Sequence, residues 1–174
     1  MTRRRGTRAV LSAIALVAAT TAWAPTAQAG HPSPFDCTGH ESITYGGLGL
    51  SSEPTSVTVD GTYRCTDPSG HVVTAPYHTE GTTPGTCLLF ASNQSVEKLR
   101  YSDGSTSVIV YKAGTSTRVL GFNVATLHGV VTEGRGKGSA AEKAIRTIPG
   151  SLPTDCVLAG GLRHTTAVTH LKVG

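Results

Sequence analysis

Apolar and polar residues alternate along much of the chain, which is the pattern of half-buried β-strands. Between Val57 and Cys65, every second residue falls on one face, and the stretch from Leu162 to Val173 alternates in the same way. Stretches of strand character are 41–50, 57–65, 95–101, 105–111, 117–131, 139–148 and 162–173. They predict an all-β domain of about seven antiparallel strands, arranged as a sandwich or a flattened barrel.

Glycines and short polar runs predict where these strands bend and turn. Asp103-Gly104 between two alternating stretches is a strong β-hairpin signal, and Gly46-Gly47 indicates a bulge or sharp bend in the first strand. We expect a further turn at Gly114-Thr115-Ser116, followed by one central strand from Thr117 to Val131. The run 139–148 has helical propensity at its alanines, but its threonine and isoleucines favour a strand.

The segment from Thr66 to Thr86 is rich in residues that interrupt regular structure. It contains Asp67-Pro68-Ser69-Gly70, Pro76, Gly81 and Pro84-Gly85. We therefore expect it to be the longest loop of the domain. Long loops in compact domains are either functional or poorly ordered, and both alternatives stay open here.

Residues 1–29 have the three parts of a signal peptide. Four arginines precede an uncharged run whose apolar core, roughly Val10 to Ala19, is too short to cross a bilayer, and Ala27-Gln28-Ala29 fits a cleavage site. Cleavage after Ala29 predicts a secreted, extracellular protein without a membrane anchor. Sec export and the twin-arginine route both remain open.

Removal of this leader changes the charge of the protein. Four of the 15 basic residues lie within it and all 11 acidic residues follow it, so residues 30–174 are formally neutral. A neutral domain lacks the basic surface that nucleic acids require, and we exclude that class of partner. The length fits one domain with one core, which we expect to be a monomer.

All four cysteines lie after the leader, and an even number in an exported protein predicts two disulfides. The spacing contains no Cys-x-x-Cys pair of the kind that zinc sites use. If the strands run up and down in sequence order, all four thiols lie toward one end, so the pattern allows every pairing. We favour Cys37 with Cys65, across the first hairpin, which leaves Cys87 with Cys156.

No group of residues in the sequence predicts a catalytic or metal site. His164 and His170 share a face but lie about 20 Å apart on one strand, which is too far for a common metal ion. His78 and Glu80 are close in sequence and are interpreted as a solvated pair. Serine and histidine are present, but no Gly-x-Ser-x-Gly motif supports a hydrolase. We predict a non-enzyme without a cofactor or metal.

Two functions remain, and parts of the sequence resemble two known groups of secreted proteins. Cys65-Thr66-Asp67-Pro68-Ser69-Gly70 with Cys87 resembles the first cysteine loop of the subtilisin-inhibitor-like proteins, which implies a secreted protease inhibitor that presents the Cys65–Cys87 loop. The whole domain resembles a group of small secreted actinobacterial proteins of uncharacterised function, through residues 57–70, 101–106 and 129–138. We favour a non-catalytic β-domain whose sheet surface or barrel interior binds an extracellular ligand or protein that the sequence does not identify, with the inhibitor as the alternative.

Overall fold

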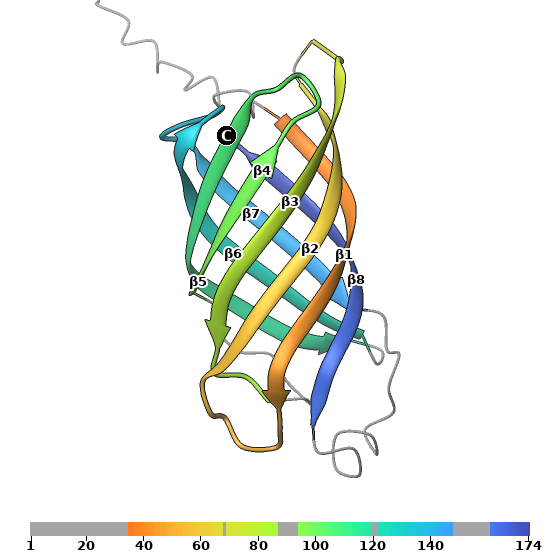
Figure 1. Ribbon diagram of the computed structural model, residues 1–174, viewed down its shortest axis with the longest axis vertical. Helices are drawn as coiled ribbons and strands as arrows, with labels where there is room; N and C mark the ends of the chain where they lie inside the picture. The colour runs from red at the N-terminus through yellow and green to blue at the C-terminus, as the bar shows by residue number, and fades with distance from the viewer. Residues whose placement is uncertain (1–34, 68, 87–93, 120–121, 148–160) are drawn as a thin grey trace, which may run out of the picture.

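Eight antiparallel strands close into one barrel (Figure 1). The computed structural model describes residues 35–67, 69–86, 94–119, 122–147 and 161–174. The strands are β1 (Phe35–Leu48), β2 (Thr55–Thr66), β3 (Val72–Thr83), β4 (Gln94–Arg100), β5 (Thr106–Val119), β6 (Phe122–Gly134), β7 (Ala140–Thr147) and β8 (Leu162–Val173). The all-β prediction is confirmed, and the barrel is the form that it takes.

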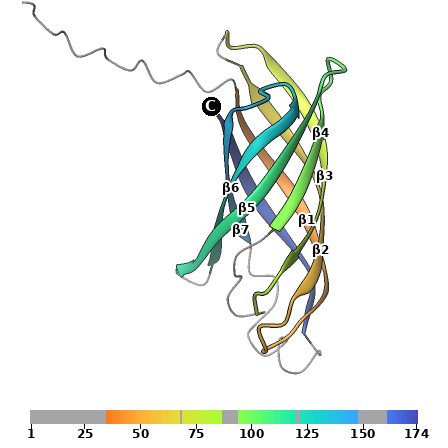
Figure 2. The ribbon, with the colours of Figure 1, turned by 90° about the vertical axis from the view of Figure 1, so that its left-hand side faces the viewer.

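Each strand pairs with its neighbours in sequence, and β8 closes the sheet by pairing with β1. The barrel has two distinct ends, and β1 starts at the end that lies uppermost in Figures 1 and 2. The β2–β3, β4–β5 and β6–β7 turns lie at this upper end because the strands alternate in direction. The predicted up-and-down order is therefore confirmed.

The alternation seen in the sequence separates the inside of the barrel from the outside. On β2, the predicted inward face is confirmed, because Val57, Val59, Tyr63 and Cys65 are all buried. On β8, Ala167, Thr169 and Leu171 are buried in the same phase. Alternate residues of a strand point to opposite faces, so one hydrophobic phase per strand fills the barrel.

The expectation of a long loop between Thr66 and Thr86 is wrong, because Val72–Thr83 forms β3. Val73, Ala75, Tyr77 and Thr79 alternate as its buried face, and this pattern outweighs the interrupting residues. Pro76 is tolerated because of its position. The carbonyl of Thr74 accepts a hydrogen bond from Ser102 on the β4 side, so the nitrogen of Pro76 faces that side too, where pairing with β4 begins only at Tyr77.

The segment around Gly114 also differs from expectation. β5 runs through Gly114-Thr115-Ser116 to Val119, and the chain reverses before β6 begins at Phe122. The register between β5 and β6 shifts between Tyr111 and Ala113, which indicates a bulge in β5. The small polar residues that follow continue the strand and do not form a turn. Residues 117–119 thus end β5 and residues 122–131 belong to β6, so the number of strands rises from seven to eight through β3 alone.

Three other local predictions are confirmed. The register of β1 against β8 shifts between Thr44 and Leu48, at the Gly46-Gly47 pair. The Asp103-Gly104 turn joins β4 to β5, with Gly104 at a positive φ. Ala140–Thr147 is a strand rather than a helix.

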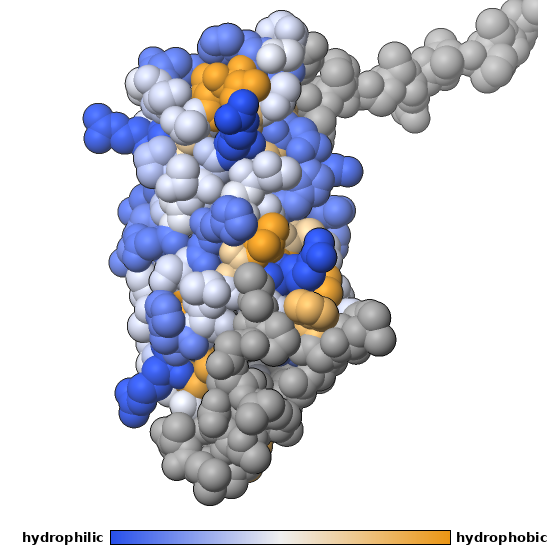
Figure 3. Space-filling view, turned by 90° about the vertical axis from the view of Figure 1, so that its right-hand side faces the viewer, coloured by the Kyte–Doolittle hydropathy of each residue, from blue (hydrophilic) through white to orange (hydrophobic). Residues whose placement is uncertain are grey.

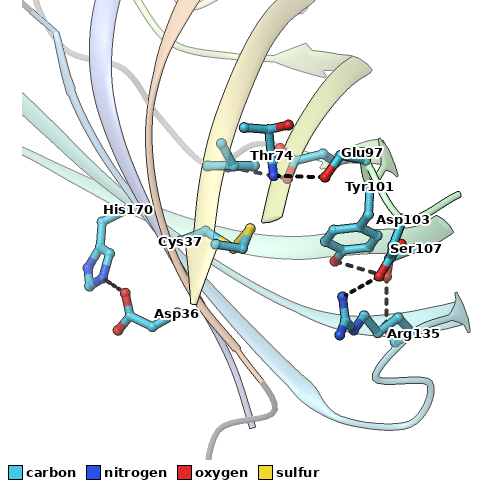
Figure 4. The surroundings of a disulfide bond; sticks show 12 residues. Asp36, Cys37, Thr74, Glu97, Tyr101, Asp103, Ser107, Arg135 and His170 are labelled. Carbon is cyan, nitrogen blue, oxygen red and sulfur yellow. Dashed lines mark hydrogen bonds and ion pairs between the residues drawn. A yellow bond between two sulfur atoms is a disulfide. The ribbon is translucent and has the colours of Figure 1, made fainter. Parts of the chain in front are cut away.

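A disulfide joins Cys37 and Cys65, which face each other directly in the β1–β2 register. The favoured pairing of these two cysteines is confirmed, and Cys87 and Cys156 lie outside the described residues. Figure 4 shows the bond at the upper end, between the outward Asp36–His170 pair and the side chains of Tyr101, Ser107 and Arg135.

Packed aromatic and polar groups fill the upper end of the barrel. The rings of Phe35 and Tyr101 meet edge to face at 5.7 Å, and the Arg135 guanidinium lies 5.2 Å from the centre of the Tyr101 ring. Burial raises the pKa of Tyr101 to about 12, against the opposing effect of its hydrogen bond with Ser107. This end of the barrel is therefore filled by packed side chains.

The face of the barrel shown in Figure 3 is mostly hydrophilic. Hydrophobic residues form small separate patches on it, between charged and polar side chains. Among the described residues, no helix has the length and hydropathy required to span a membrane.

Candidate functional site

Three charged side chains lie inside the barrel, where aliphatic residues are the rule. Glu41 on β1, Glu97 on β4 and Lys143 on β7 have side chains that are at most 1 % exposed. Each occupies the inward phase of its strand, so closure of the barrel brings them together from three parts of the chain. Buried charges are stable only when they are paired and hydrogen-bonded.

Lys143 is the centre of this cluster. Its Nζ lies 2.6 Å from Glu97 Oε2 and 2.8 Å from Glu41 Oε2, so one ammonium bridges two carboxylates. The same nitrogen lies 4.6 Å from the centre of the Tyr77 ring, within cation–π distance. Two carboxylates and an aromatic face thus surround the three N–H bonds of the ammonium.

Glu97 has partners for both of its oxygen atoms. Oε1 accepts hydrogen bonds from Tyr63 at 3.3 Å and Tyr111 at 3.4 Å, and Oε2 accepts one from Thr79 at 3.1 Å beside the Lys143 contact. This carboxylate is a structural group whose bonding capacity is used within the protein.

Glu41 differs from Glu97 because only one of its oxygen atoms is used. Oε2 accepts from Tyr77 at 2.5 Å and from Lys143, whereas Oε1 is buried without a hydrogen-bond partner among the described residues. A buried acceptor without a partner is costly and calls for an explanation. In this barrel, the unpaired oxygen belongs to a side chain that lines a cavity.

Glycines make room for the tyrosines of the cluster. Gly61 on β2 lies between Glu41 and Tyr77 in the register, and a Cβ at Gly61 would collide with the Tyr77 ring. The missing side chain therefore lets the Tyr77 hydroxyl reach across β2 to Glu41. Gly39 and Gly129 make similar room for Tyr63 and Tyr111.

A cavity occupies the lower half of the barrel, below this cluster. The space inside it that the centre of a water-sized molecule can occupy is about 50 Å³. Its walls come from β1, β2, β3, β6 and β7, and most of them are apolar. The lining residues are Glu41, Ile43, Tyr45, Val57, Val59, Thr83, Asn123, Ala125, Leu127, Ile145 and Thr147.

A second acceptor without a partner faces the same cavity region. Asn123 Oδ1 is buried and has no hydrogen-bond partner among the described residues. Its main-chain carbonyl accepts from Thr147 at 3.1 Å, which holds β6 and β7 together at this level. The cavity thus combines an apolar wall with two unused oxygen acceptors, from Glu41 and Asn123.

The electrostatic environment keeps Lys143 charged. Burial by itself lowers the pKa of Lys143, but the nearby carboxylates of Glu97 and Glu41 outweigh this effect and raise that pKa well above its usual value. Burial, reinforced by the Glu97 charge, raises the pKa of Tyr63 and of Tyr111 as well, so these phenols remain neutral. A protonated lysine is neither a nucleophile nor a general base.

The histidines singled out in the sequence lie elsewhere, on the outer surface. His78 Nδ1 lies 2.7 Å from Asp60 Oδ1, and its Nε2 lies 3.5 Å from Glu80 Oε1. His170 pairs with Asp36, and the described residues contain no group of three or more His, Cys, Asp or Glu placed to hold a metal ion. The structure therefore brings His78 and Glu80 together, but as an exposed pair away from the cavity.

The His78 pair makes a testable prediction about pH. The hydrogen bond that His78 donates to Asp60 raises the pKa of His78 above 6.5, so the small stability that this pair contributes is fully present below pH 6.5 and is lost as pH rises through the raised value. In an NMR titration, the Asp60→Asn variant should show a His78 pKa closer to 6.5 than that of the unaltered protein. Asp67→Asn, at a turn distant from this pair, should leave it unchanged, and an unchanged pKa in Asp60→Asn would contradict the assignment.

Sequence reasoning did not find Glu41, Glu97 or Lys143. Their signal is a charge in the inward phase of an alternating strand, as for Glu97 between Ser95 and Leu99, which are both buried. That signal becomes visible only when the register of each strand is known.

Comparison with protein-family models, with curated protein sequences and with solved structures finds no match for this chain.

Proposed function

We propose that this protein is a secreted, non-catalytic binding domain that holds one small molecule in the lower half of its barrel. The observation that carries the proposal is a cavity lined by Glu41, whose Oε1 is a buried carboxylate oxygen without a partner among the described residues. Small-molecule sites are concave, mostly apolar and equipped with a few polar groups that orient the ligand. The cavity has each of these properties.

The size of the cavity also supports a small ligand. The centre of a water-sized molecule can move through about 50 Å³ of it, which exceeds the roughly 10–15 Å³ that one water needs and limits the ligand to a compact molecule. An eight-stranded barrel is just wide enough to be filled by side chains or to hold one small molecule. Here the upper half is filled by packed side chains and the lower half leaves space.

Export is the second part of the proposal. The leader of residues 1–29 and the cross-strand disulfide fit an oxidising compartment outside the cytoplasm.

The protease-inhibitor alternative loses the features that favoured it. Cys65 is bonded to Cys37, so no disulfide joins Cys65 to Cys87, and Val72–Thr83 is a barrel strand rather than an exposed loop. A rigid loop held by its own disulfide is what presentation to a protease requires. We therefore retain the interior-binding function alone.

Filling the cavity should abolish binding. The probe is N-phenyl-1-naphthylamine, a neutral apolar compound whose fluorescence rises in apolar sites. Ala125→Phe places a ring into the cavity and should weaken saturable binding at least tenfold, because the ring takes the place of the probe.

The neighbouring Thr126→Phe is the matched control, because Thr126 occupies the opposite phase of β6 and does not line the cavity. Its fluorescence titration should resemble that of the unaltered protein. Absence of saturable binding in the unaltered protein, or equal binding by both variants, contradicts the proposed function.

A further inference from the structure

We propose that the ligand carries a positively charged amine, which donates a hydrogen bond to Glu41 Oε1 at the inner end of the cavity, while its apolar body lies against the walls. This inference rests on the proposed function and names the chemical class that the cavity selects. It is carried by the unsatisfied acceptors, by the charges around them and by the apolar lining.

The first step concerns hydrogen bonding. The two buried side-chain oxygen atoms without partners that belong to lining residues, Glu41 Oε1 and Asn123 Oδ1, are both acceptors. A complementary ligand therefore supplies donors, and a ligand whose polar group only accepts hydrogen bonds would leave these atoms unsatisfied. An anionic ligand would meet the Glu41 carboxylate and is selected against.

The second step concerns charge. The buried cluster contains two acidic side chains, Glu41 and Glu97, and one basic side chain, Lys143, so among the described residues it has one acidic group in excess. None of the described residues that line the cavity is a lysine, an arginine or a histidine. A cation at Glu41 Oε1 would balance the cluster, as Lys143 balances it from the opposite side.

The third step distinguishes the two carboxylates. Glu97 accepts four contacts from protein groups. In Glu41, Oε2 contacts Lys143 and Tyr77, whereas Oε1 has no hydrogen-bond partner among the described residues. Lys143 and Tyr77 hold the carboxylate in place, so that Oε1 is preorganised for a donor. Charge-assisted hydrogen bonds are shorter and stronger than neutral ones, which favours an ammonium over a hydroxyl.

The last step concerns the apolar body of the ligand. Ile43, Val57, Val59, Leu127 and Ile145 surround the space between Glu41 and the mouth. These side chains suit an alkyl or arylalkyl chain and offer little to a sugar. The class is therefore a primary amine on a compact hydrophobic group.

Calorimetric titration with three compounds of similar shape tests this inference. The probes are 2-phenylethylamine, 2-phenylethanol and 3-phenylpropionate, which differ in the charge of the polar end. The unaltered protein at neutral pH should bind the amine at least tenfold more tightly than the alcohol and should not bind the acid measurably.

Two carboxylate variants on the same strand locate the selectivity. Glu41→Gln should bring the affinities for the amine and the alcohol within about twofold of each other, because an amide replaces the carboxylate. Asp36→Asn removes the same charge from the outer face of β1, beside His170, and should leave the tenfold preference unchanged.

The outcomes separate this inference from the proposed function. Equal binding of amine and alcohol by the unaltered protein, or a preference that survives in Glu41→Gln, overturns the inference while the cavity site stands. Failure of N-phenyl-1-naphthylamine and of all three compounds to bind overturns the proposed function itself. If Glu41→Gln does not fold, the comparison of the three compounds on the unaltered protein decides whether the ligand class is an amine.

Discussion

Replacement of Lys143 by methionine should destabilise the barrel by about 3–5 kcal/mol, the cost of removing one partner from a buried ionic group. Methionine fits the volume of the lysine stem but leaves the carboxylates of Glu41 and Glu97 buried without the ammonium that bridges them. Urea unfolding at neutral pH, followed by circular dichroism, measures the change in the free energy of unfolding. Lys172→Met, on the exposed phase of β8, is the matched control and should change it by less than about 0.5 kcal/mol.

The pH dependence of this variant identifies the cause of its instability. Protonation removes the negative charges of the two carboxylates, so folding at low pH no longer buries an uncompensated charge. The deficit should therefore shrink between pH 7 and pH 4. A deficit that is small at pH 7, or independent of pH, contradicts the account of a charged cluster.

Loss of the Cys37–Cys65 disulfide should cost about 3–4 kcal/mol. The two cysteines are 28 positions apart, and the chain-entropy model gives this magnitude for a closed loop of that length. Cys37→Val with Cys65→Val keeps apolar side chains inside the barrel, so the change reports chiefly the cross-link. The free energy of unfolding in urea is the measurement.

The denaturant slope provides the control for the disulfide variant. An unfolded chain without the cross-link exposes more surface, so the urea m-value of the double variant should rise. A packing defect alone would lower stability without raising the m-value. A loss below about 1 kcal/mol with an unchanged m-value contradicts the assigned role of the bond.

The arrangement of the barrel separates stability from binding. The disulfide, Phe35 and Tyr101 lie at the upper end, the charged cluster lies below them, and the cavity occupies the lower half. Glu41 is the residue that belongs to both the cluster and the cavity. The groups that hold the barrel together thus also orient the carboxylate that faces the ligand space.

Alternation alone was sufficient to predict most of the fold. It placed Val59, Tyr63 and Leu171 inside, and the Asp103-Gly104 pair located the hairpin between β4 and β5. β3 was missed because Pro76 and Gly81 were weighed as interruptions. Their cost is low here, since Pro76 precedes the pairing with β4 and Gly81 packs closely against Ser95.

The candidate site could not be predicted in the same way. Glu41, Glu97 and Lys143 lie on strands that are far apart in the sequence, and only closure of the barrel brings them into contact. A lone charge on an alternating strand is also compatible with an exposed position, as for Glu142 beside Lys143. The phase of each strand must be known to one residue before such a cluster can be recognised.

Methyl NMR during titration with N-phenyl-1-naphthylamine tests the interior site most directly. Ile43, Leu127 and Ile145 line the cavity, whereas Val96 and Val130 are exposed on the outer face of the barrel. The account predicts saturable shift changes at the methyl groups of the three lining residues and none at the two outer valines. Shift changes at Val96 and Val130 without changes at the lining residues would show that the ligand binds outside the barrel and would contradict it.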